Sequence, residues 1–208
     1  MSSAMTPEAQ PITAPHTSAH LEDRARTEQM GYWLYLMSDA ILFVALFATY
    51  AVLHANSAGG PEASDIFEFS RTALNSALLL TSTLVLGFSG IGFAKGNKGA
   101  GFGWLAAAFA LGALFVGLEV QEFAALVAQG ASPQTSGFLS AYFALVATHG
   151  LHVTVGLIWM LTYVALLLYE GPTRRVLANG NRLAAFWHMI GIVWIGIYSV
   201  VYLPGILQ

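Results

Sequence analysis

Long apolar runs dominate the chain, and short polar segments separate them. Five runs carry at most one charge each, at 31–53, 72–94, 99–118, 137–169 and 183–208. The third continues as an apolar pattern past two glutamates to about residue 127. A helix needs about 20 mostly apolar residues to cross the hydrocarbon core of a bilayer. The pattern therefore predicts five spans, at about 31–53, 72–94, 101–127, 137–169 and 183–207.

The fourth run, 137–169, is the longest, but it is too short for two spans and a turn, so one long helix is expected. Backbone groups in lipid must be paired within the protein, which favours helices throughout. We therefore expect an all-α membrane bundle. It forms one domain over 30–208, preceded by a polar tail, 1–29, that is disordered or bound to a partner.

The charge content agrees with a membrane protein. Hydrophobic residues make up 56% of the 208 residues, and charged residues only 9%. A soluble domain carries roughly 25% charged residues. The net charge of −3 lacks the basic excess of a nucleic-acid binder. Because the sequence contains no cysteine, disulfides and thiolate metal sites are excluded.

Basic residues fall mostly on one side of the predicted bundle. Loops rich in Lys and Arg stay in the cytoplasm. The N-terminus is therefore expected in the cytoplasm and the C-terminus in the periplasm. Arg71 alone lies on the periplasmic side, against seven cytoplasmic residues: Arg24, Arg26, Lys95, Lys98, Arg174, Arg175 and Arg182.

Six ionisable residues fall inside the predicted spans, where each one is costly and marks a candidate functional site. Glu119 and Glu122 are three residues apart near the outer end of the third span. The simplest interpretation of this pair is a solvated helix end, unless Glu122 turns inward. The other four form an expected intramembrane polar cluster: Asp39, His149, His152 and His188.

The spacing of His149 and His152 places both imidazoles on one helix face. Either histidine, together with His188, could hold a b-type haem between two spans. The alternative is that the histidines hydrogen-bond neighbouring helices or Asp39. Spacing alone favours these polar contacts but leaves both interpretations open. The sequence contains no G-x-S-x-G, H-E-x-x-H or P-loop motif of a catalytic site.

Several segments together resemble subunit III of the haem-copper terminal oxidases. They are GYWLYLMSDAILF in the first span, GLEVQEF in the third, SGFLSAYF and THGLHV in the fourth, and FWH in the last. The resemblance covers about residues 30–205. The five-span form is most similar to the bo-type ubiquinol oxidases of Gram-negative bacteria. One departure is Gly191, where the family usually has an aspartate.

The resemblance implies a non-catalytic subunit of a proton-translocating ubiquinol oxidase in the bacterial inner membrane. The complex would oxidise quinol and reduce oxygen to water, with the haems and copper in partner subunit I and no metal ligand in this chain. Subunits I, II and IV and membrane phospholipid would be its partners. Its role would be to support assembly, stability, lipid binding and proton uptake. Asp39 matches the family's membrane carboxylate near the large partner subunit.

We expect Asp39 to hydrogen-bond His149 or His152, with His149 favoured. Asp39 lies ~12 Å into its span, where an unpaired carboxylate costs about 3 kcal/mol. Asp39→Asn should weaken subunit association while oxygen reduction continues, as measured by copurification and oxygen uptake. Loss of quinol oxidation in a complex that remains intact would contradict this structural role.

Overall fold

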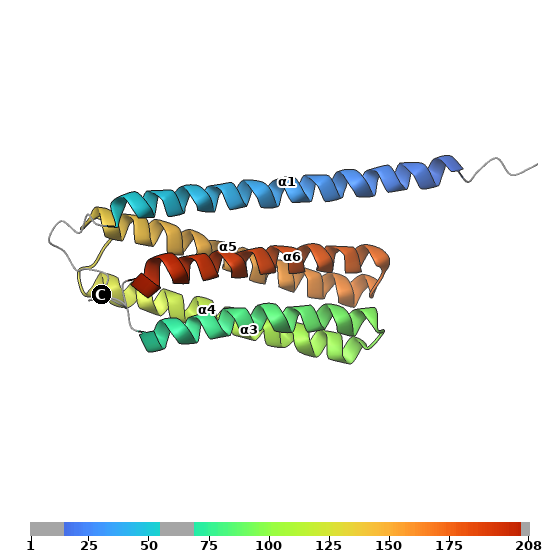
Figure 1. Cartoon of the computed structure of the whole chain (residues 1–208). Coiled ribbons are helices and arrows are strands. Elements are labelled where there is room, and N and C mark those ends of the chain that lie inside the picture. Colours follow the sequence, from blue (N-terminus) through green and yellow to red (C-terminus); the bar gives the residue numbers. More distant parts are fainter. Residues whose placement is uncertain (1–14, 55–68, 205–208) are drawn as a thin grey trace, which may run out of the picture. The chain divides into compact units, whose positions relative to one another are not determined.

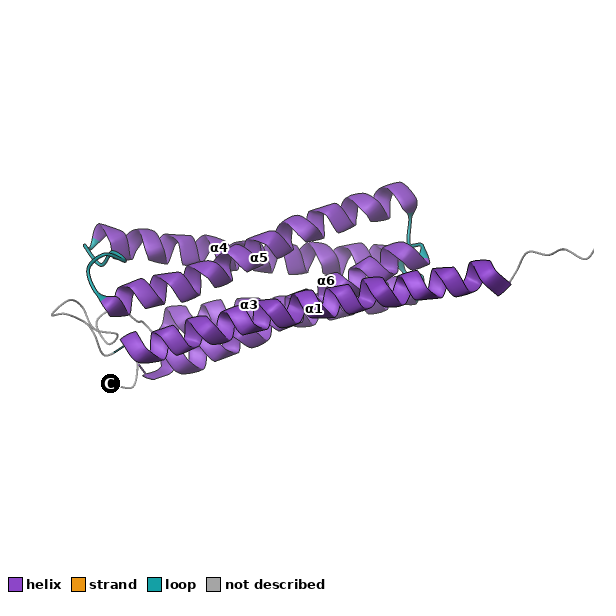
Figure 2. Ribbon diagram, turned by 90° about the horizontal axis from the view of Figure 1, so that it is seen from above, coloured by secondary structure: helices purple, strands orange, loops and turns teal. Residues whose placement is uncertain are grey.

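The computed structural model describes residues 15–54 and 69–204, which are helical apart from short turns (Figures 1 and 2). The helices are α1 (Pro15–Leu53), α3 (Phe69–Ala94), α4 (Lys98–Ala128), α5 (Gly137–Glu170) and α6 (Arg174–Ile197), and a π-helical turn, η1 (Tyr198–Tyr202), follows α6. Five helices in this described part are long and apolar enough to cross a membrane. The predicted all-helical class and the predicted number of spans are thereby confirmed.

The chain forms two compact units, Met1–Asp39 and Ala40–Gln208. Helix α1 contributes to both units. It begins at Pro15, inside the segment that we expected to be a polar tail. In the second unit, the part of α1 after residue 39 packs against α5, where the ring of Phe43 lies 5.0 Å from that of His152.

Side-chain caps begin three of the helices in the second unit. Asn97, Ser136 and Thr173 each accept a hydrogen bond from the backbone N–H three residues later, at 3.1, 3.1 and 3.3 Å. Helix α5 ends at Gly171, whose φ of +72° is disfavoured for residues with a Cβ. The turn from α3 to α4 and the turn from α5 to α6 lie at one end of this unit (Figure 1). The turn from α4 to α5 lies at the other end.

Small residues bring α3 and α4 close together. A Cβ added to Gly92 would lie 2.8 Å from the backbone nitrogen of Gly101. Ser89 donates a hydrogen bond of 2.9 Å to the carbonyl oxygen of Gly101. Contacts of this kind hold helices together in lipid, where apolar burial drives association only weakly.

Trp187 of α6 connects the other three core helices of the second unit. A Cβ added to Gly112 of α4 would lie 2.8 Å from its indole, and one added to Gly156 of α5 would lie 2.6 Å from it. The indole N–H donates to the Ser82 hydroxyl of α3 at 3.1 Å, and that hydroxyl donates to the Ala108 carbonyl of α4 at 2.9 Å. Trp187 therefore fills space that exists only because two facing residues lack side chains.

The departure at Gly191 coincides with a tight contact between α6 and α3. A Cβ added to Gly191 would lie 2.9 Å from the Thr83 methyl carbon. The aspartate expected from the family resemblance would fit here only if the Thr83 side chain or the helices moved. Close by on α6, the indole N–H of Trp194 donates to the Ser76 hydroxyl of α3 at 3.0 Å.

Gly156→Ala should destabilise the bundle, because the new methyl group displaces the Trp187 indole. Overpacking of this kind typically costs about 1–3 kcal/mol. Gly150→Ala is the matched control on the same helix, since a Cβ there meets nothing within 4 Å. Thermal unfolding of the detergent-purified chain should show a lower midpoint for Gly156→Ala alone. Equal midpoints for the two variants would contradict this role of Trp187.

Candidate functional site

A buried polar cluster lies near the end of the bundle where α4 and α5 join. Its members are all buried, and they are Glu119 and Glu122 of α4, Asn75 of α3, Tyr142 of α5 and Tyr202 of η1. Four separate elements therefore supply polar groups to one place inside the apolar bundle. We call these five residues the carboxyl cluster.

Hydrogen bonds connect the carboxyl cluster in two parts. The Asn75 side-chain amide donates to Glu119 Oε1 at 2.8 Å. The Tyr142 hydroxyl donates to Glu122 Oε1 at 3.2 Å and lies 3.1 Å from the Tyr202 hydroxyl. In these two hydrogen bonds each glutamate accepts from a neutral group, the amide of Asn75 for Glu119 and the phenol of Tyr142 for Glu122.

The expectation of a solvated helix end was wrong for this pair. Glu119 is 4% exposed and Glu122 8% exposed, since both face the interior of the bundle. The π-helical turn η1 brings Tyr202 inward beside the equally buried Val201. The sequence signal for this buried cluster is a polar residue inside an apolar run, such as Asn75 within 72–94.

His149 lies in an aromatic pocket. Its imidazole is completely buried, with ring centres of Phe43, Phe115 and Trp194 at 6.2, 6.0 and 5.2 Å. Among the described residues of 40–204, neither of its ring nitrogens has a hydrogen-bond partner. The neighbours of this imidazole are therefore aromatic rings from α1, α4 and α6.

His152 and His188 each donate from Nδ1 to a carbonyl oxygen of their own helix, at 2.7 Å to Thr148 and 2.6 Å to Ala184. His188 is exposed, so the second unit does not bring it to the buried His149. The described residues contain no group of three His, Cys, Asp or Glu side chains placed to hold a metal. The geometry therefore gives no support to haem ligation by these histidines.

Asp39 is the last residue of the first unit. Tyr35, one helical turn earlier, is a hydrogen-bonding neighbour of its carboxylate. The expected hydrogen bond from a histidine of α5 to Asp39 would join the two units, and it stays a prediction.

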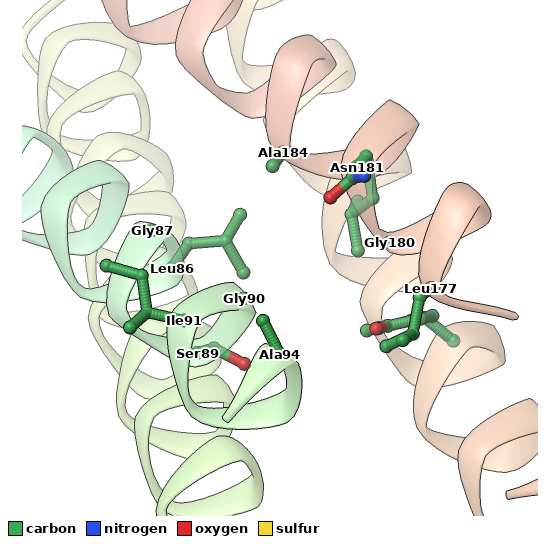
Figure 3. A pocket seen from close by; sticks show the side chains of 12 residues that line it. Leu86, Gly87, Ser89, Gly90, Ile91, Ala94, Leu177, Gly180, Asn181 and Ala184 are labelled. Atoms are coloured by element: carbon green, nitrogen blue, oxygen red, sulfur yellow. The ribbon is translucent and has the colours of Figure 1, made fainter. Parts of the chain in front are cut away.

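An apolar cavity of about 430 Å³ lies between α3 and α6, at the end where α5 and α6 join. Figure 3 shows its small lining residues on the two helices, which include Gly87 and Gly90 of α3 and Gly180 and Ala184 of α6. A Cβ at Gly87 or Gly90 would meet nothing within 4 Å, so these glycines widen the cavity. Its mostly apolar lining suits a hydrocarbon chain better than a polar ligand.

Comparison with known proteins gives a consistent result over nearly the whole chain. A family model described as cytochrome c oxidase subunit III matches residues 12–206. Cytochrome bo(3) ubiquinol oxidase subunit 3 of Pseudomonas putida is 46% identical over 185 residues, 89% of each chain. The protein of the same name from Pseudomonas aeruginosa is 44% identical over 192 residues, 92% of each chain. Quinol oxidase subunit 3 of Bacillus subtilis is 34% identical over 184 residues, 88% of this chain and 90% of that one.

Proposed function

The chain belongs to the cytochrome c oxidase subunit III family, and we propose that it is the non-catalytic subunit III of a proton-translocating ubiquinol oxidase. Because it belongs to this family and has five helices long and apolar enough to cross a membrane, the chain is a multi-pass membrane subunit of a haem-copper oxidase complex. The observation that carries the finer proposal is its 46% and 44% identity to two subunits named for bo(3) ubiquinol oxidase.

The aromatic packing inside the bundle agrees with a non-catalytic, supporting role for this chain. The buried histidine, His149, is enclosed by aromatic rings, and Trp187 and Trp194 fill the centre of the bundle. The side chains packed around this imidazole are thus aromatic. The family resemblance implies that quinol oxidation and oxygen reduction take place on haems and copper in subunit I, with subunits II and IV completing the complex.

We also propose that Asp39 stabilises the association with the large partner subunit. The support is the position of Asp39 inside the apolar part of α1, in a span whose side chains are mostly exposed in the isolated chain. A buried carboxylate needs a hydrogen-bonding or charged partner in lipid. In the same way, the cavity between α3 and α6 offers a site for an acyl chain of structural phospholipid.

Deleting this chain should leave the haem absorbance of the partner subunit close to normal, while assembly yield or stability during turnover falls. The deletion complex should also yield a smaller amount of extractable lipid than the complete complex. The isolated chain should have no Soret absorbance, which distinguishes it from a b-type cytochrome anchor. Complete loss of haem from the complex, or a haem spectrum in the isolated chain, would contradict the supporting role.

The proposed orientation places the N-terminus in the cytoplasm and the C-terminus in the periplasm of the bacterial inner membrane. The cysteine-free sequence allows a direct test with single cysteines at two exposed positions, Lys98→Cys at the start of α4 and Gln134→Cys in the turn from α4 to α5. In intact spheroplasts, a membrane-impermeant thiol reagent should label Gln134→Cys, and should label Lys98→Cys only after permeabilisation. The reverse pattern would invert the orientation.

A further inference from the structure

Two buried oxygen atoms in the carboxyl cluster have no hydrogen-bond partner among the described residues. They are Glu119 Oε2 and Asn75 Oδ1. The two residues already share one hydrogen bond, from Asn75 Nδ2 to Glu119 Oε1, at 2.8 Å. Both unpartnered atoms are acceptors when the carboxyl group is ionised, so neither can satisfy the other. Leaving such groups unpaired in a buried site is costly.

A single proton would satisfy both atoms. A protonated carboxyl group has one O–H donor beside its carbonyl oxygen, and a primary amide has the matching pair of groups. If Glu119 Oε2 carries the proton, it can donate to Asn75 Oδ1 while Oε1 keeps accepting from Nδ2. We propose that Glu119 is a buried proton-binding site, held as a neutral acid in a two-hydrogen-bond acid–amide pair with Asn75.

A second carboxyl group on α4 and a cation on α3 both act on Glu119. Glu122 lies one turn away on α4, and two carboxylates that close repel each other. The Tyr142 hydroxyl of α5 donates to Glu122 Oε1 and lies beside the Tyr202 hydroxyl of η1. Arg71 of α3 is the cation that attracts Glu119 through space, but it makes no hydrogen bond with the carboxyl within the described part of the chain.

In this proposal, the number of hydrogen bonds between α3 and α4 depends on whether Glu119 is protonated. With the proton in place, two hydrogen bonds join the helices at this point. Loss of the proton to water removes one of them, leaves Asn75 Oδ1 unpaired, and places a negative charge beside Glu122. The site is thus a proton-dependent contact within this chain, and it does not depend on the proposed role in quinol oxidation.

Infrared difference spectroscopy of the oxidase complex containing this chain tests the proposal. At neutral pH, Glu119→Gln should remove a carboxylic-acid C=O absorption that in the wild type shifts in D₂O. Glu170→Gln is the control, because Glu170 is exposed at the end of α5 and should lose only carboxylate absorption. If Glu119→Gln instead removes carboxylate absorption, Glu119 is ionised and its oxygens are satisfied by water or a cation, which overturns the proposal.

Assembly yield supplies an independent measurement. Glutamine can form the same two hydrogen bonds with Asn75, so the yield of Glu119→Gln should stay within about twofold of wild type. Asn75→Leu breaks the pair, and its yield should fall about tenfold, as expected for a buried acid left without partners. Failure of Glu119→Gln to assemble, or normal assembly and an unshifted acid absorption in Asn75→Leu, would overturn the proposal.

Discussion

The indole of Trp187 occupies space that Gly112 and Gly156 leave open on two other helices, and its N–H bonds to Ser82 on a third. In lipid, helices associate through close packing and interhelical hydrogen bonds. Moving apolar side chains from lipid into a helix interface contributes little to the association free energy, because both surroundings are apolar. The Ser82 hydroxyl also donates to the Ala108 carbonyl, so one hydroxyl ties α3, α4 and α6 together. This junction sets the position of α6, and hence where Trp194 and Tyr202 meet their partners.

The apolar runs predicted the fold because membrane thickness sets a minimum length that a sequence displays directly. The apolar run 137–169 nearly coincides with helix α5, where Ser136 caps the start and Gly171 follows the end. Helix α6 begins at Arg174, nine residues before the predicted span 183–207. The family was recognisable from motifs within the spans, and the comparisons bear it out. The start of α1 at Pro15 was not predictable, since polar residues with prolines give no periodic signal there.

The candidate site was harder to predict, because burial of a side chain depends on residues distant in the sequence. Glu119 meets Asn75, 44 residues away, and Tyr142 meets Tyr202, 60 residues away. Helical spacing places Glu119 and Glu122 on one face but does not say what covers that face. The π-helical turn that positions Tyr202 likewise leaves no simple pattern in the sequence. Sequence spacing made His149 and His188 equally good candidates for the intramembrane polar cluster. In the structure His149 is buried and His188 is exposed.

The contact between Gly191 and Thr83 constrains how this chain and its relatives can diverge. The two positions share one small volume between α3 and α6, so a larger side chain at one requires a smaller side chain, or a wider helix separation, at the other. If the helix separation stays the same, aspartate at residue 191 therefore requires a different side-chain position at residue 83. The packing at one position thus limits which side chains fit at the other, more than a hundred positions earlier in the sequence.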